Sequence, residues 1–393
     1  MKKPNEYKIQ KRKDNRWYVQ IRHKGHTYCI YGKTKKEAQE KLICKIRQLQ
    51  EATLNGIDII SAEMKLKDWA ALCVETYSKQ NVRGNTYSSY LTIVKYHLKG
   101  IGDRKLNEIN NIMIQNHLSN LRTYDGQRPL NPGMIKNVRN FLSMVFNYAI
   151  RNNIVTRNPV LGTHIPRDIP SSPRSFTIDE QSNLIKAVRE YDKPIMFSVI
   201  IAAYTGIRKG ELLALKWIDV DRTNKRLVIN KQLNRQHNFN QSEGPSSTLT
   251  VSPPKTATSV RYVYLFDSLF AELTKYMEKR LQWKEDNGFV HSENDYLFSN
   301  SNNQAIEPRR YYQYYKEILK NAGIENANFH TLRHTFTTRC LESGIDIVII
   351  SKMLGHANAR ITADTYSHLL DEQKKKEIEK TAHLFFPSKD LTQ

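Results

Sequence analysis

A proline-rich segment near the middle of the chain most constrains how the chain can fold. Residues 158–175, NPVLGTHIPRDIPSSPRS, contain four prolines and no regular spacing of apolar residues. Proline removes a backbone donor and restrains φ, so this segment cannot continue a helix or a central strand. The chain has 393 residues, which is more than one typical domain needs. We therefore predict a linker over residues 161–176, with separate folded regions before and after it.

The first 60 residues predict a small sheet backed by one helix. The segments RWYVQIR (16–22) and HTYCIYG (26–32) alternate apolar and polar residues, which is typical of strands, and Lys24-Gly25 between them forms a turn. The segment that follows begins with a capping box at Thr34 and continues with apolar residues at helical spacing.

The alternation also predicts which side of this sheet is exposed. Val19 and Ile21 would face the helix. Tyr18, Gln20 and Arg22 alternate with them and would lie on the opposite, exposed face. This region is basic, with 15 Lys and Arg against 6 Asp and Glu. A narrow polar sheet with a basic rim can enter a DNA major groove, and a solvated face of an accessory domain is the alternative. The candidate DNA-contacting residues are Tyr18, Gln20, Arg22 and Lys24.

The net charge predicts a polyanionic partner. The formal charge is +22 and the sequence pI is near 9.7, which favours nucleic acid first and an acidic membrane second. Charge that only keeps the protein soluble is the alternative. The sequence has no apolar run of about 18–20 residues that could span a bilayer, and its start does not resemble a signal peptide. Four scattered cysteines, read as small buried hydrophobes, fit a reducing cytoplasm.

The hydrophobic patterns predict a multidomain α+β chain. Residues 1–60 form the small sheet-plus-helix domain, and 64–160 read as four or five short amphipathic helices, an all-α bundle. Residues 177–393 read as a mostly α domain, with strands at 225–233 and 259–266 forming a small antiparallel sheet. Between these strands we expect a long mobile hairpin loop.

Several polar residues stand out in the third region. Arg208 closely precedes an apolar helix and therefore needs an anionic partner; Glu211 would serve, as a purely structural pair. His330 and Arg333 lie on one side of the first turn of another helix, and Gly355 ends a third. Tyr366 is expected in the helix that follows. Two arginines, two histidines and a tyrosine, with almost no carboxylates among them, indicate an anion site. In such a site arginines stabilise negative charge and a tyrosine can act as nucleophile.

A metal site is the alternative at the same place. His330 and His334 are spaced as in HExxH, but Thr331 stands where the glutamate would be and Arg333 lies between the histidines. A cation is electrostatically disfavoured there, so we expect no metal.

Three segments together resemble the tyrosine recombinases of the phage-integrase class: TGIRKGELLALKWIDVD (205–221), HTLRHTFTTRCLESGIDIVIISKMLGH (330–356) and ITADTYSHL (361–369). The layout, with a basic sheet domain first, is similar to integrases of conjugative transposons and to lambda-type integrases. The matching catalytic positions are Arg208, Lys255, His330, Arg333, His356 and Tyr366.

The resemblance implies a mechanism. Tyr366 would attack a DNA phosphodiester, forming a 3′-phosphotyrosine, and Arg208 and Arg333 would stabilise the charged phosphorane. Lys255 would protonate the leaving oxygen, His330 would serve as acid or base, and His356 would hydrogen-bond the phosphate. The bond energy would stay in the phosphotyrosine, so neither ATP nor another cofactor is expected. The run of tyrosines over 311–315 is interpreted as helix packing.

The resemblance also implies the partners. The 1–60 domain would bind arm-type sites in double-stranded DNA, while the 64–160 bundle and the 177–393 catalytic domain would clamp a core site. A homotetramer would assemble on DNA in the cytoplasm, at the nucleoid, with an accessory directionality factor, for integration, excision or transposition of a mobile element. The apolar tail at 384–386 would dock on the neighbouring protomer or on its own domain. A type IB-like topoisomerase and a non-catalytic DNA-binding regulator are the alternatives.

Overall fold

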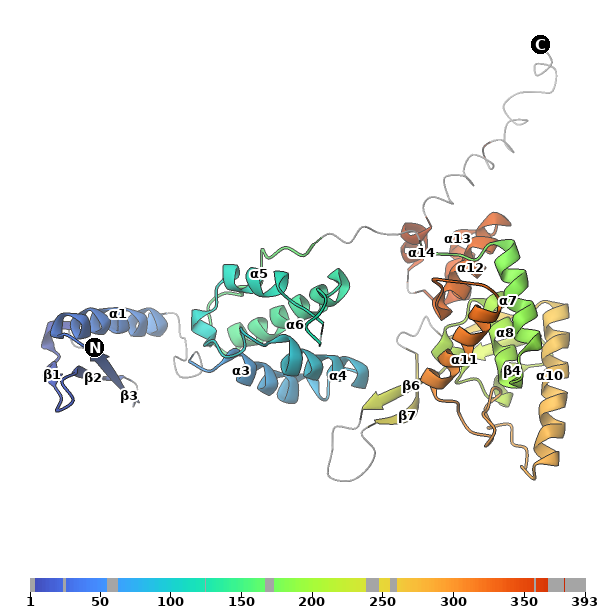
Figure 1. The fold of residues 1–393 in the computed structure, drawn as a ribbon, viewed down its shortest axis with the longest axis horizontal. Helices are drawn as coiled ribbons and strands as arrows, with labels where there is room; N and C mark the ends of the chain where they lie inside the picture. The colour runs from blue at the N-terminus through green and yellow to red at the C-terminus, as the bar shows by residue number, and fades with distance from the viewer. Residues whose placement is uncertain are drawn as a thin grey trace, which may run out of the picture. The chain divides into compact units, whose positions relative to one another are not determined.

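The computed structural model describes residues 4–23, 26–54, 63–123, 125–166, 173–237, 247–254, 260–356, 358–366 and 378 (Figure 1). The chain divides into two compact units, Met1–Ile169 and Pro170–Gln393, and the division falls within the predicted linker. The predicted turn residue Lys24, the catalytic candidate Lys255 and the apolar tail at 384–386 lie outside the described residues.

The first unit begins with a three-stranded antiparallel sheet. After a 3-10 turn at Pro4–Glu6, strands β1 (Gln10–Lys11), β2 (Trp17–His23) and β3 (His26–Gly32) pair in that order. Helix α1 (Lys35–Leu54) covers one face of the sheet (Figure 1). Strand β1 was missed because two residues are too few to show an alternating pattern.

The faces of this sheet agree with the prediction. Val19 and Ile21 are buried against α1, in a core that also contains Leu42, Ile46 and Leu49. On the opposite face Gln20 and Arg22 are exposed and Tyr18 is half-buried. The expectation that all four cysteines are buried was wrong for Cys29 and Cys44, which are exposed: Cys29 lies opposite Gln20 on the outer face of the sheet.

All four helical segments expected after residue 64 are present in the first unit. They are α3 (Leu66–Cys73), α4 (Gly84–Thr92), α5 (Asn111–Ser119) and α6 (Pro132–Arg151), and the first two continue into π-helices at Val74–Ser78 and Ile93–His97. A 3-10 turn at Leu106–Glu108 precedes α5. Asn131 caps α6 by accepting from the Met134 N–H at 2.8 Å, and Pro132 occupies the first helical position, where proline is favoured.

Both ends of the predicted 161–176 linker are packed. At its start the His164 N–H donates to Oε1 of Gln115 on α5 at 2.7 Å. At its end Phe176 is buried, and its N–H donates to Oγ1 of Thr335 at 2.8 Å. The polar partners at both ends explain how a segment with no helical or strand pattern keeps its backbone groups satisfied there.

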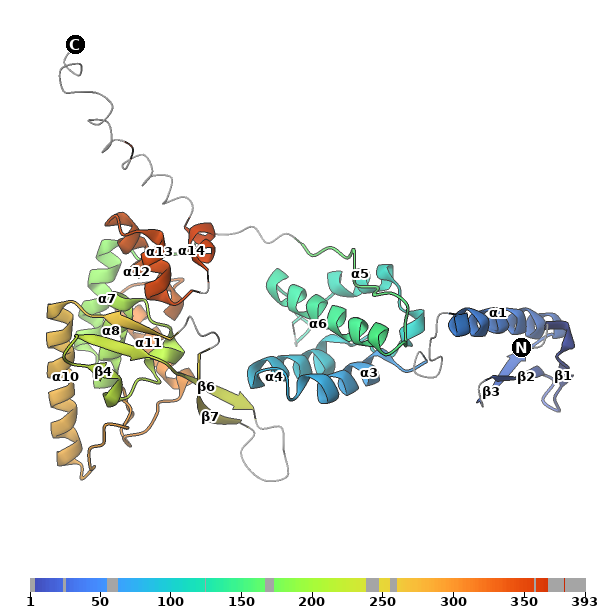
Figure 2. The same ribbon diagram turned by 180° about the vertical axis from the view of Figure 1, so that it is seen from behind.

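The second unit is mostly helical around a small sheet (Figure 2). Strands β4 (Val220–Asp221), β5 (Arg226–Ile229) and β8 (Arg261–Tyr264) form an antiparallel sheet in that order. The helices are α7 (Ile178–Glu190), α8 (Phe197–Thr205), α9 (Lys209–Leu212), α10 (Asp267–Asp286), α11 (Pro308–Asn321), α12 (Phe329–Glu342), α13 (Ile347–Leu354) and α14 (Ala359–Thr365), with 3-10 turns at Pro194–Met196 and Trp217–Asp219.

Helix α8 lies at the centre of this unit, and nearly all of its residues are buried. It packs against α12, which brings the chain near residue 206 beside the helix that carries residues 330–342. On α11, Tyr311 and Tyr315 are fully buried, which confirms that this tyrosine run serves helix packing. The core therefore fixes the elements that carry the candidate catalytic residues.

The stretch expected to be a long loop is partly β-structure. Strands β6 (Gln232–His237) and β7 (Ser247–Ser252) pair as an antiparallel hairpin. Arg235 explains part of this order, because its Nη1 donates to Oγ of Ser247 at 2.6 Å and its Nε donates to Glu307 at 3.0 Å. The polar composition had suggested a loop, but long-range ion pairing overrides it.

Within the part of the chain that the structure describes, no helix is both long and apolar enough to cross a membrane.

Candidate active site

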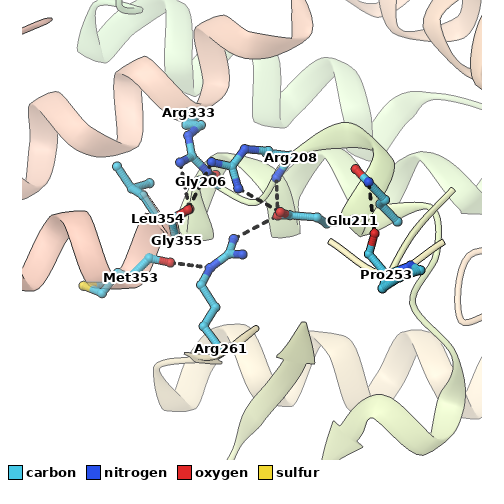
Figure 3. A network of polar contacts seen from close by, with 10 residues as sticks. Gly206, Arg208, Glu211, Pro253, Arg261, Arg333, Met353, Leu354 and Gly355 are labelled. Atoms are coloured by element: carbon cyan, nitrogen blue, oxygen red, sulfur yellow. Dashed lines mark hydrogen bonds and ion pairs between the residues drawn. The ribbon is translucent and has the colours of Figure 1, made fainter. Parts of the chain in front are cut away.

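Two helices end side by side at left-handed glycines, and one arginine bridges their ends (Figure 3). Helix α8 stops at Gly206 (φ 64°) and α13 stops at Gly355 (φ 66°). From α12, Arg333 donates from Nη1 to the Gly206 carbonyl at 2.9 Å and from Nη2 to the Leu354 carbonyl at 2.7 Å. Carbonyls at helix C-termini carry partial negative charge, so they stabilise a buried guanidinium.

Arg333 remains charged despite its burial. Its exposed fraction is 3%, and this burial, together with the charges of Arg208 and Arg261, lowers its pKa to about 9. The guanidinium is therefore protonated at neutral pH and can interact with an anion.

Arg208 lies beside Arg333 and is more open to solvent. Its Nη1 donates to Oε1 of Glu211 at 2.8 Å, and its Nη2 approaches the Gly355 carbonyl at 3.3 Å. The structural pair that the sequence left open is thus present. The pair still leaves the guanidinium accessible, because 36% of the Arg208 side chain is exposed while Glu211 is buried.

Arg261 on β8 is a residue of the site that the sequence reasoning missed. It is buried, donates from Nη2 to Oε2 of Glu211 at 2.9 Å and from Nε to the Met353 carbonyl at 2.7 Å. Residue 355 has a left-handed φ of 66°, which favours glycine, and a Cβ there would make a tight contact of 3.0 Å with the Arg261 guanidinium. An available signal was the strand pattern, which places a positive charge at an inward-facing position.

Glu211 is the shared anion of this network. Burial alone would raise its pKa, but the hydrogen bond and charge of Arg261 and the charge of Arg208 lower its pKa on balance. A single buried carboxylate thus holds two arginines in place. The arrangement joins two segments that are distant in sequence, one with Arg208 and Glu211 and the other with Arg261.

The two predicted histidines lie at the edge of the arginine cluster. His356 follows Gly355 directly, and its Nδ1 is 2.8 Å from Oγ1 of Thr362. Burial and the charges of Arg333 and Arg208 lower the pKa of His356 to about 4. His330 lies at the surface of the site on the first turn of α12, where partial desolvation and the same two charges lower its pKa.

The sequence predicted that Tyr366 lies inside a helix. In the structure Tyr366 instead lies just past the end of α14. Its exposed fraction is 4%, and its hydroxyl is 2.5 Å from Nδ1 of His334. Burial raises the pKa of Tyr366, and a hydrogen bond with Thr337 and the charge of Arg333 act against that rise. The sequence reasoning weighed His334 only as a metal ligand, so its contact with Tyr366 was missed.

The described residues therefore bring five of the six predicted catalytic positions into one region, and Lys255 lies outside them. Pro253, two residues before Lys255, accepts a hydrogen bond from Nε2 of Gln232 at 3.3 Å (Figure 3). Among the residues that the structure describes, none form a group of three or more His, Cys, Asp or Glu side chains suited to a metal ion.

The chain is similar to known proteins over most of its length. The phage integrase family matches residues 174–373. A XerC-like tyrosine recombinase of Caldanaerobacter subterraneus is 29% identical over 370 residues, which is 91% of each chain. The ICEBs1 integrase of Bacillus subtilis is 23% identical, over 89% of this chain and 88% of the relative.

Solved structures share the fold. The Tn1549 transposon integrase in complex with transposon right end DNA aligns with a TM-score of 0.66 at 19% identity, over 81% of this chain and 100% of that chain. A lambda integrase dimer bound to a core site aligns with a TM-score of 0.56 at 18% identity, over 91% of this chain and 93% of that chain.

The arginine-rich site can bind an anion and stabilise added negative charge, and the chain belongs to the phage integrase family. Its relatives and its fold make it a tyrosine site-specific recombinase of the mobile-element type.

Proposed function

We propose that this recombinase cleaves and rejoins double-stranded DNA through a 3′-phosphotyrosine at Tyr366. One observation carries the proposal: Arg333 and Arg208 are held by the carbonyls of neighbouring helix ends, at Gly206, Leu354 and Gly355. Two fixed guanidinium groups can each bind non-bridging phosphate oxygens and stabilise the additional negative charge of a phosphorane. The nucleophile Tyr366 is tied to the same helix, α12, through His334.

The remaining residues take complementary roles in this proposal. His356 hydrogen-bonds the phosphate at the end of α13, and His330 acts as acid or base at the exposed side of the site. Lys255 protonates the leaving 5′ oxygen, a role that the resemblance to the recombinase motif implies for this lysine. The arginines replace a metal in stabilising charge, so cleavage proceeds without cofactors.

The nucleophile is tested by trapping the covalent intermediate. DNA recovered by selection with the purified protein is incubated in excess chelator, and denaturant-resistant adducts are counted. We expect adducts with the natural protein and with Tyr312→Phe, a control that removes a half-buried hydroxyl elsewhere in the same unit. Tyr366→Phe should bind DNA with nearly unchanged affinity and form none. Adducts in Tyr366→Phe would move the nucleophile to another residue.

A second assay separates recombination from the alternatives. Strand exchange between two labelled duplexes is expected of a recombinase. Relaxation of supercoiled DNA without exchange would favour a type IB-like topoisomerase, and binding without adducts would favour a non-catalytic regulator.

The exposed face of the N-terminal sheet is the proposed reader of arm-type sites. Tyr18 stacks near Tyr31, and Arg12 and Arg16 lie over these rings, so the face combines aromatic and cationic groups. Together with Gln20 and Arg22, it offers hydrogen-bond and phosphate contacts in a groove. Replacing Arg22 with Ala should weaken binding to arm sites more than to core sites, in titrations repeated at two salt concentrations. Equal losses at both sites would refute a separate reader.

Assembly on DNA is proposed as a homotetramer, acting on core sites in the cytoplasm at the nucleoid, with an accessory directionality factor. Support comes from a lambda integrase tetramer bound to a Holliday junction, which shares this fold with a TM-score of 0.56. The tail residues 384–386 would then dock on the neighbouring protomer. Deleting residues 381–393 should weaken pairing of two sites while single-site binding persists. Loss of monomer thermal stability would instead place the tail on its own domain.

A further inference from the structure

A histidine without a role in the proposed function holds the nucleophile. His334 lies one helical turn after His330 on α12, and its Nδ1 is 2.5 Å from the Tyr366 hydroxyl oxygen. The two rings are tilted by 55°, with centroids 5.9 Å apart. Tyr366 is buried, with an exposed fraction of 4%, and His334 is half-buried. The contact therefore joins the reacting oxygen directly to an ionisable group.

The surroundings of His334 determine the direction of this hydrogen bond. The His330 and His334 rings meet edge to face, with centroids 4.6 Å apart. Arg333 precedes His334 on α12, and Thr337 lies beside Tyr366. Burial, and then the positive charges of His330 and Arg333, lower the pKa of His334 to about 4. At neutral pH the imidazole is thus neutral, and Nδ1 accepts the hydrogen bond while the phenol donates it.

We propose that His334 is the general base that takes the proton of Tyr366 during DNA cleavage. The O–H bond of Tyr366 breaks and its proton moves to Nδ1, as the phenol oxygen bonds to phosphorus. The P–O5′ bond breaks in the same step, and the 5′ oxygen receives a proton from the separate acid of the proposed function. On rejoining, a 5′-hydroxyl attacks phosphorus and gives its proton to the conjugate base of the leaving-group acid. The bond from phosphorus to the Tyr366 oxygen breaks, and protonated His334 returns its proton to the departing phenolate. This inference rests on Tyr366 as nucleophile.

Bound DNA strengthens such a base. A phosphate between Arg208 and Arg333 offsets positive charge that otherwise disfavours an imidazolium, so the basicity of His334 increases when substrate occupies the site. In the free protein the neutral ring keeps the phenol protonated and in place.

The test separates a proton acceptor from a positioning contact. In His334→Asn the amide oxygen can replace Nδ1 as hydrogen-bond acceptor, yet it cannot take a proton. Single-turnover adduct formation is measured on the selected DNA, from pH 6 to 9, with binding measured in parallel. We expect unchanged binding, adduct formation about 10²-fold slower, and a rate that rises with pH because hydroxide must remove the proton. A natural rate in His334→Asn would overturn the proposal.

A modified substrate distinguishes the two ends of the reaction. A duplex with sulfur in place of the bridging 5′ oxygen has a leaving group that needs no proton. The defect of His334→Asn should persist on this duplex, whereas a variant lacking the leaving-group acid, Lys255→Ala, should recover. Recovery of His334→Asn would place His334 on the leaving-group side and refute the assignment.

A second variant keeps the test decisive if Asn disturbs folding. His334→Ala should regain adduct formation when imidazole is added, in proportion to the free base, which a structural role would not predict. Absence of rescue in a folded His334→Ala that binds DNA, together with an unslowed His334→Asn, would reject the base. If the natural protein itself forms no adduct, the proposed function fails and not this inference alone.

Discussion

Replacing Arg261 with methionine should destabilise the catalytic unit by about 3 kcal/mol, since removal of one partner from a buried ion pair costs about 3–5 kcal/mol. We take the lower end because Glu211 keeps Arg208 as a second partner at 2.8 Å. The loss includes the hydrogen bond from Arg261 to the Met353 carbonyl. Arg189→Met is the matched control: it breaks an Arg–Glu pair with side chains 59% and 40% exposed, and should cost below about 1 kcal/mol.

Hydrogen exchange of α8 and α12 peptides in the full chain is the assay, because it reads the unfolding free energy of this unit separately. A loss of about 3 kcal/mol corresponds to exchange on the order of 10²-fold faster in Arg261→Met. Adding Glu211→Gln should recover part of the loss, since the uncompensated carboxylate is then removed. If Arg261→Met exchanges no faster than Arg189→Met, Arg261 does not hold the network together.

Three further outcomes follow from the site. Gly206→Ala should lower both stability and cleavage, because its φ is 64° and a Cβ would lie 2.7 Å from Phe336; unchanged melting would contradict this. Arg208→Lys should lower the adduct rate severely without loss of DNA binding, because an ammonium cannot bind phosphate in bidentate fashion; a near-natural rate would return Arg208 to a structural role. His334 and His356 have pKa values lowered to about 4, so the unfolded chain binds more protons than the folded chain between about pH 6.5 and 4. The free energy of unfolding should therefore decrease as the pH is lowered through this range. Equal free energies from urea titrations at about pH 7 and pH 5 would refute this.

Local patterns predicted much of this structure because their causes are local. The alternation in β2 correctly assigned Val19 and Ile21 to the core, since side chains on a strand point to opposite faces. Gly355 ends α13 as predicted, because its left-handed conformation suits glycine. The catalytic positions came instead from spaced motifs, and the structure places Arg208 and Arg333 together as those motifs imply.

The missed features depend on contacts between residues distant in sequence. Arg261 pairs with Glu211, fifty positions away, and only the β5–β8 pairing brings it inward. His334 meets Tyr366 because α14 returns the chain to α12, which spacing along one helix cannot reveal. The β6–β7 hairpin was likewise read as loop, because its polar strand residues are held by partners such as Glu307.

The way the site holds its charge also bears on how it can act. Arg333 is fixed by neutral carbonyls at helix ends, so its positive charge is stabilised but not cancelled by a carboxylate there. Glu211 partly offsets Arg208 and Arg261, and it is buried, so it stays away from an incoming phosphate at the exposed edge of Arg208. The cluster thus keeps excess positive charge before DNA arrives. In the proposed mechanism a phosphate is attracted to that excess, and its binding relieves the repulsion that keeps His334 neutral. Substrate binding and activation of Tyr366 would then be coupled by the same charges.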